Sequence, residues 1–212
     1  MFHNRQDAGE RLAAALLPYR AADTLVLGIP RGGVPVAAGI AGALGVELDV
    51  AIARKLGVPG EPELAMGAVT ATDRLYLDQG IIARRAVSPE QVAEVIARES
   101  TEAKARNALF RGGRPEPAIA GRTVIVVDDG IATGATFRAT LQAVRAQRPA
   151  RLIAAAPVGP RETSELLQTD ADVVVCLATQ EPFEAVGFSY DDFQAVPDDT
   201  VAAILRSFTR WP

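Results

Sequence analysis

Apolar and polar residues alternate along this chain with two different periods. Five short runs, made largely of β-branched and small apolar residues, predict buried strands at 25–29, 48–53, 124–127, 151–157 and 173–177. Between most of these runs, apolar residues recur at helical spacing, at 7–19, 34–44, 137–147 and 161–168. Strands that alternate with helices predict an α/β fold, with a doubly wound, mostly parallel five-stranded sheet covered by helices on both faces.

Three further segments predict local structure outside this alternation. Residues 65–69 and 74–77 predict a small hairpin around Ala71-Thr72-Asp73. Ser88-Pro89-Glu90-Gln91 is a capping box with proline at the first helical position, so a helix is expected from there to about residue 110. Asp198 is the expected cap of a last helix over 200–208.

Length and composition limit the class of protein. With 212 residues and 49% hydrophobic content, the chain can bury a large core, and a single domain over 1–212 is the simplest expectation. A net charge of −4 without a Lys/Arg cluster argues against a nucleic-acid partner. Cys176 is the single cysteine, which excludes an internal disulfide framework and favours a cytoplasmic setting. The amphipathic start over 1–17 predicts neither a signal peptide nor a membrane span.

The strand at 124–127 leads into the segment with the clearest chemistry. Asp128 and Asp129 stand where the strand should end, and a loop of small residues then leads into a helix. That loop consists of Ile131, Ala132, Thr133, Gly134, Ala135 and Thr136. Backbone N–H groups at a helix start and threonine hydroxyls suit a phosphate, whereas carboxylates accept hydrogen bonds from sugar hydroxyls. The segment therefore predicts a ribose 5-phosphate site. The alternative is a strand-ending turn with a threonine helix cap.

A second strand-to-helix junction, Pro30-Arg31-Gly32-Gly33, follows the first strand. Its glycines permit close backbone approach and Arg31 adds positive charge at a helix start, so it could hold diphosphate; the alternative is an ordinary turn. Arg54 and Lys55 end the next strand and precede a Gly- and Pro-rich loop. They are either a solvated strand end or part of an anion site. The sequence contains neither the Gly-x-Gly-x-x-Gly fingerprint after its first strand nor a P-loop.

These residues resemble the type I phosphoribosyltransferases, which use 5-phosphoribosyl 1-diphosphate (PRPP). The resemblance implies that Asp128 and Asp129 bind the ribose, that loop 131–136 wraps the 5-phosphate, and that Arg31, Gly32 and Gly33 bind diphosphate. Arg54 and Lys55 would begin a mobile flap at about 55–80 and would also bind the diphosphate, with Lys55 as a catalytic residue beside the two aspartates. The implied cofactor is Mg²⁺, held mainly through PRPP with Asp128 and Asp129 nearby. The second partner would be a small nitrogenous base.

A hood at about 178–197 is implied to cover that base, with Phe183 or Tyr190 stacking on its ring; alternatively these aromatics close the core beneath a loop. Ala132 stands where 6-oxopurine members of the family carry an Asp, which argues against hypoxanthine or guanine as the acceptor. Gly130 replaces the more usual aliphatic residue or Ser, which is expected to loosen the loop entrance.

Over nearly its whole length the chain is similar to a bacterial group of predicted phosphoribosyltransferases with an undefined acceptor. The resemblance also admits a homodimer, because a family loop often crosses a dimer interface. Two other functions stay open: a PRPP- or nucleotide-sensing regulator, and a protein that binds or hydrolyses another sugar phosphate.

Overall fold

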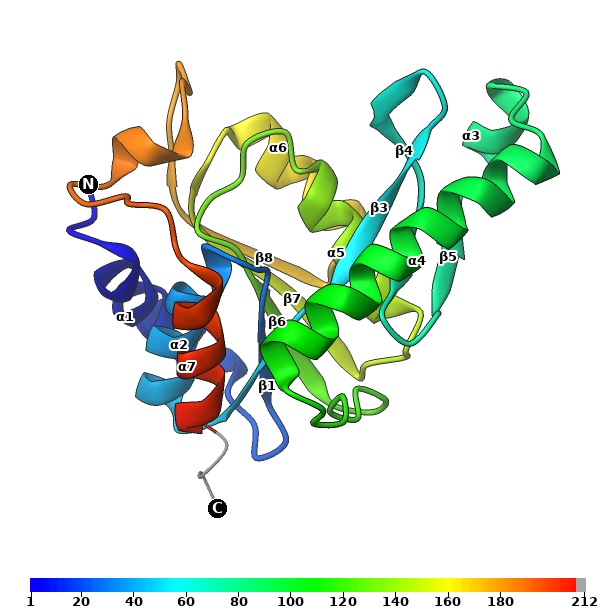
Figure 1. Cartoon of the computed structure of the whole chain (residues 1–212). Helices are drawn as coiled ribbons and strands as arrows, with labels where there is room; N and C mark the ends of the chain where they lie inside the picture. Colours follow the sequence, from blue (N-terminus) through cyan, green and yellow to red (C-terminus); the bar gives the residue numbers. More distant parts are fainter. Residues whose placement is uncertain (209–212) are drawn as a thin grey trace.

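A central sheet of five parallel strands organises the computed structural model, which describes residues 1–208 (Figure 1). The strand order is β2-β1-β6-β7-β8. The bounds are β1 Leu25–Gly28, β2 Glu47–Val50, β6 Thr123–Val127, β7 Arg151–Gly159 and β8 Val173–Thr179. β1 pairs with β6 in parallel, from Leu25 opposite Val124 to Gly28 opposite Val127. The predicted fold class is therefore confirmed, and the two strands that precede the candidate loops are neighbours.

Helices cover both faces of this sheet because side chains alternate between faces along each strand. One face packs against α1 (Arg5–Leu16), α2 (Gly33–Leu44) and α7 (Asp198–Phe208). The other face packs against α5 (Ala135–Arg145) and, at Leu167, against the turn that follows α6 (Arg161–Leu166). Short 3₁₀ turns lie at η1 Leu17–Tyr19, η2 Leu167–Thr169 and η3 Val186–Ser189. In the part of the chain described, no helix is both long and apolar enough to cross a membrane.

A smaller antiparallel sheet projects from the core beside α5 (Figure 1). Its strands are β3 Ala53–Val58, β4 Glu61–Thr70 and β5 Leu75–Leu77, followed by α3 Gln79–Arg84 and α4 Pro89–Arg111. This sheet, α3 and the first half of α4 share a core of their own, which includes Leu56, Met66, Val69 and Val95. We call this unit, residues 53–100, the arm.

The structure of the arm differs from the sequence prediction in two details. The predicted strand at 48–53 is two strands, because β2 ends at Val50 and β3 begins at Ala53 in the other sheet. The segment expected as a Gly- and Pro-rich loop pairs with β4, with register shifts on either side of Gly57. The hairpin predicted around Ala71-Thr72-Asp73 is confirmed by the pairing of β4 with β5.

Helix boundaries agree closely with the sequence pattern. α1 begins at Arg5, two residues earlier than predicted, because the Asn4 side chain accepts hydrogen bonds from the N–H groups of Gln6 and Asp7. The Ser88 capping box of α4 is confirmed, and Gly112 ends that helix in the left-handed conformation. Asp198 lies in the first turn of α7 rather than before it.

Candidate active site

Two loops meet where the chain order of the central sheet reverses, at the carboxyl ends of β1 and β6. β2 lies on one side of β1 and β7 on the other side of β6, so the two loops leave the sheet next to each other. The N–H of Ile29 donates to the carbonyl oxygen of Val127 at 2.8 Å, which extends the strand pairing to the start of both loops. Open α/β sheets bind ligands at this position.

The loop after β1 is in contact with the acidic pair. A Cβ atom on Gly32 would lie 1.8 Å from Oδ2 of Asp129, so a side chain cannot be placed there without moving the carboxylate. The Pro30–Arg31 peptide bond in this loop is cis. Arg31 is exposed, and its Nη1 lies 3.9 Å from Oδ1 of Asp198. The predicted diphosphate and ribose residues therefore lie together.

The loop after β6 is anchored at its start and open beyond it. Ile131 is buried, and its N–H donates to the Val158 carbonyl oxygen at 2.8 Å. Ala132, Thr133 and Thr136 are exposed, and α5 begins at Ala135. The exposed part presents small side chains, two hydroxyl groups and the helix start, which suits an anion.

Gly130 does not loosen the entrance to this loop. A Cβ atom at Gly130 would lie 2.4 Å from Cγ1 of Val186, a residue of the predicted hood. The missing side chain lets Val186 pack directly on the loop. In this chain, the space that a side chain at position 130 would need is filled by Val186 of the hood.

The two carboxylates have different surroundings. Asp129 forms an ion pair with Arg5 of α1, with 2.8 Å between Arg5 Nε and Asp129 Oδ2, and both side chains are largely buried. Oδ1 of Asp128 accepts a hydrogen bond from the N–H of Asp129. Burial raises the pKa of Asp128 well above its ordinary value, and the neighbouring Asp129 carboxylate adds to the rise. Asp129 thus has a counter-cation in Arg5, whereas Asp128 favours its protonated form.

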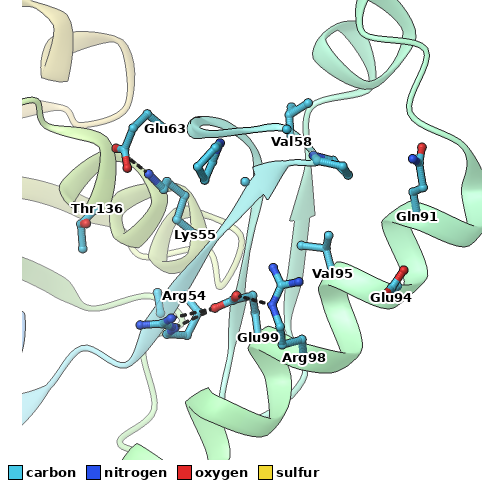
Figure 2. Close-up of a pocket in the computed structure, with 15 residues that line it drawn as sticks. Arg54, Lys55, Val58, Glu63, Gln91, Glu94, Val95, Arg98, Glu99 and Thr136 are labelled. Carbon is cyan, nitrogen blue, oxygen red and sulfur yellow. Dashed lines mark hydrogen bonds and ion pairs between the residues drawn. The ribbon is translucent and has the colours of Figure 1, made fainter.

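Arg54 and Lys55 line a cavity of about 580 Å³ between the arm and Thr136 (Figure 2). Arg54 is paired with Glu99 of α4, with 2.8 Å between Arg54 Nη2 and Glu99 Oε2. Lys55 Nζ lies 3.0 Å from Oε2 of Glu63. Residues 31–33 do not line this cavity. The structure therefore places Arg54 and Lys55 in a cavity that borders the predicted phosphate loop, and their assignment to the diphosphate stays a prediction.

The hood residues lie differently from the expectation of a ring-stacking site. Tyr190 is only 6% exposed, and its ring contacts Phe2 and Phe193, with centroids 5.5 and 4.9 Å away. Its hydroxyl group donates to the Asp129 carbonyl oxygen at 2.6 Å. Burial raises the pKa of Tyr190. Phe183 is partly buried against the same aromatic cluster. This placement favours the alternative in which these aromatics close the core under the loop.

Several residues that contact predicted site residues were not singled out by the sequence, among them Arg5, Glu63 and Glu99. Arg5 is 124 positions from its partner Asp129 and lies in an ordinary amphipathic helix, so nothing local indicates its contact. Glu63 and Glu99 become notable only once the arm places them against Lys55 and Arg54.

The donor groups near the acidic pair bear on the expected Mg²⁺. Within residues 1–208, no three His, Cys, Asp or Glu side chains are grouped as a metal site. Two adjacent carboxylates, one of them paired with Arg5, fit a Mg²⁺ that takes most of its ligands from substrate oxygens and water, as this ion commonly does.

Comparisons with known proteins agree with this geometry. The family model for the phosphoribosyl transferase domain matches residues 2–192. A Mycobacterium tuberculosis protein with a provisional phosphoribosyl transferase name is 40% identical over 205 residues, which cover 97% of this chain and 46% of that protein. The chain thus spans about half the length of these curated relatives. The crystal structure of TT1426 from Thermus thermophilus is 42% identical and superposes with a TM-score of 0.91, covering 98% of each chain. The chain belongs to the phosphoribosyl transferase domain family.

Proposed function

We propose that this chain transfers the 5-phosphoribosyl group of PRPP to a nitrogenous base and releases diphosphate. The observation that carries the proposal is the contact between Gly32 and the carboxylate of Asp129. It joins a loop suited to diphosphate and a carboxylate suited to ribose hydroxyls, and the phosphate loop 131–136 continues from the same strand end. Diphosphate, ribose and 5-phosphate follow one another in the same order along PRPP.

Catalysis on such a site is mainly positional and electrostatic. Asp128 and Asp129 would accept hydrogen bonds from the ribose hydroxyls, and loop 131–136 would hold the 5-phosphate. Arg31 and the backbone of Gly32 and Gly33 would bind the diphosphate as its bond to C1 breaks and positive charge develops on the sugar. When bound, Mg²⁺ supplies charge that offsets the negative charge of the diphosphate. Exclusion of water would direct the sugar toward the base.

The acceptor is defined here only by exclusion. Ala132 is exposed, and its methyl side chain cannot form a hydrogen bond to a purine ring, unlike the Asp that the 6-oxopurine members carry at this position. We therefore propose an acceptor other than a 6-oxopurine.

Calorimetric titration with PRPP and Mg²⁺ tests the proposal. The wild-type chain should bind PRPP, and the double variant Asp128→Asn/Asp129→Asn should lose most of this affinity. Asp191→Asn/Asp192→Asn is the matched control, because it removes an adjacent acidic pair of the hood away from the loop contact. No PRPP binding by the wild type would contradict the proposal and favour another sugar phosphate as ligand.

Diphosphate release, measured across a panel of nitrogenous bases, then separates an enzyme from a sensor. Turnover with at least one base is expected. Tight PRPP binding without turnover on any base would favour the regulator.

A further inference from the structure

The cavity between the arm and Thr136 has a charged lining with opposite signs interspersed. β3, β4, α4 and the start of α5 enclose its volume of about 580 Å³ (Figure 2). The cations are Arg54, Lys55 and Arg98, and the carboxylates are Glu63, Glu94 and Glu99. What the cavity can bind depends on which of these charges can change partner.

Arg54 and Arg98 share one buried partner. Glu99 is 8% exposed, and its two oxygens accept from Arg54 Nε at 2.9 Å and from Arg98 Nε at 3.1 Å. Removing a cation from a buried carboxylate is costly, since the remaining charge has little access to water. The Arg54–Glu99 pair therefore fixes β3 to α4, and Arg98 adds a second cation to the same carboxylate from within α4. Both arginines are poor candidates for binding a new anion.

Lys55 has a different kind of partner. Its side chain is 18% exposed, whereas the side chain of Glu63 is 84% exposed. An ion pair with so exposed a carboxylate contributes little, because water and salt stabilise Glu63 equally well after the two separate. Lys55 is thus a mostly covered cation whose partner can leave at low cost.

The anion that would replace Glu63 is indicated by what borders the pair. Thr136 lines the same cavity as Lys55 and Glu63. Glu63 also lines a second cavity, of about 270 Å³, together with Thr133 and Ala135 of the phosphate loop. The Lys55–Glu63 pair therefore lies beside the loop that we propose for the 5-phosphate, and the carboxylate of Glu63 would repel a phosphate there.

We infer that Lys55 is a second ligand of the phosphate held by loop 131–136, and that Glu63 stays paired with Lys55 until that phosphate binds. This inference rests on the proposed function and changes the role of Lys55 from the diphosphate to the opposite end of the sugar. The ligand class is a phosphate monoester, whose dianion attracts the lysine and repels Glu63. Glu63 then swings into solvent, and Lys55 links the arm to the core through the ligand.

Calorimetry of the full chain with ribose 5-phosphate tests this inference, with inorganic phosphate and unphosphorylated ribose as comparison probes. Glu63→Gln should bind ribose 5-phosphate about three- to tenfold more tightly than wild type, because the competing charge is gone. Lys55→Met should bind about tenfold more weakly. In Lys55→Met/Glu63→Gln the gain from Glu63→Gln should be smaller, because only the direct repulsion between Glu63 and the phosphate is then relieved. Ribose binding should not respond to either change.

Glu61→Gln is the matched control. Glu61 lies in the same strand, forms an exposed ion pair of 3.1 Å with Arg85, and does not line the cavity. It should bind ribose 5-phosphate as wild type does, and thermal unfolding of all variants separates lost binding from lost fold. Equal affinities for Glu63→Gln and Glu61→Gln, or for Lys55→Met and wild type, would overturn the inference, as would no binding of ribose 5-phosphate by any variant.

The proposed transferase function and the inference about Lys55 can fail independently of each other. A gain in ribose 5-phosphate affinity in Glu63→Gln without PRPP turnover would reject the transferase and leave the role of Lys55 intact. Turnover with PRPP that is indifferent to Glu63→Gln and Lys55→Met would reject only the role of the lysine.

Discussion

Asp129 is the residue at which three distant segments of the chain converge. Arg5 of α1 pairs with its carboxylate, Gly32 lies against it, and the hydroxyl group of Tyr190 bonds to its backbone carbonyl. Arg5 also donates to the Gln194 carbonyl oxygen at 2.8 Å. The N-terminal helix and the hood are therefore tied to the proposed ribose carboxylate, and the orientation of Asp129 depends on both.

Arg5→Met should weaken PRPP binding by about tenfold, because Asp128 and Asp129 lose the cation that offsets their repulsion. Arg11→Met is the control. Arg11 lies over the Phe2 ring at 4.4 Å, on the same helix, and pairs with Asp7 instead of Asp129. Titration of both variants with PRPP and Mg²⁺ gives the comparison. Tighter binding by Arg5→Met than by Arg11→Met would show that Arg5 competes with the sugar instead of positioning the carboxylate.

Asp128→Asn should make the protein more stable at neutral pH while it weakens PRPP binding. The pKa of Asp128 is raised in the folded protein, so ionisation of this group costs stability above its unfolded pKa of about 3.9. Asparagine keeps the acceptor for the N–H of Asp129 without the charge. We expect a gain of about 1 kcal/mol in the free energy of unfolding at pH 7.

The stability gained by Asp128→Asn should depend on pH, because it arises from the raised pKa of Asp128 in the folded protein. As pH falls toward 4, the wild-type carboxyl group takes up its proton and recovers the lost stability, so the gap between wild type and Asp128→Asn should narrow. Urea unfolding of both proteins at pH 7 and pH 4.5 measures it. A variant that is less stable than wild type at pH 7 would show that the Asp128 charge is well compensated.

At the scale of elements, the sequence predicted those structures whose cause is local. The strands of the central sheet follow from short apolar runs, and the start of α4 follows from the Ser88 capping box. The acidic pair and its loop could be placed at a sheet edge because they directly follow β6. Glycine spacing likewise placed the loop after β1 at the same edge once the two strands were taken as neighbours.

Elements whose partners lie far along the chain were harder to predict. Residues 53–62 contain two glycines and two prolines, which are typical of a loop, yet β3 and β4 form because the strand register shifts around Gly57. The end of α4 was predicted, but its attachment to the central sheet was not: Arg111 is 4% exposed and pairs with Asp49 of β2 at 3.1 Å, 62 positions away. Sequence patterns report neither kind of contact, because each depends on the folded arrangement.

The whole molecule consists of a sheet covered on both faces and an arm with its own core. Residues 51–52 and α4 connect the two units. Ala53 and Ala68 of the arm also pack against Ala139 and Ala143 of α5. Small side chains bury little apolar area, so this contact contributes less to stability than the cores of the sheet or the core of the arm. The arm is therefore suited to move as one body against the phosphate loop, rather than as a flexible two-stranded flap.

Native-state hydrogen exchange should detect this division. Backbone amides of β4, between β3 and β5, should open with a free energy about 2 kcal/mol below that of amides in β6, because unfolding the arm leaves both main cores intact. Ribose 5-phosphate should raise the protection of β4 in wild type and not in Lys55→Met, since the lysine would join the arm to the ligand. If β4 and β6 amides open with the same free energy, the arm and the sheet form one cooperative unit, and the small alanine contact with α5 holds them together more firmly than its buried area indicates.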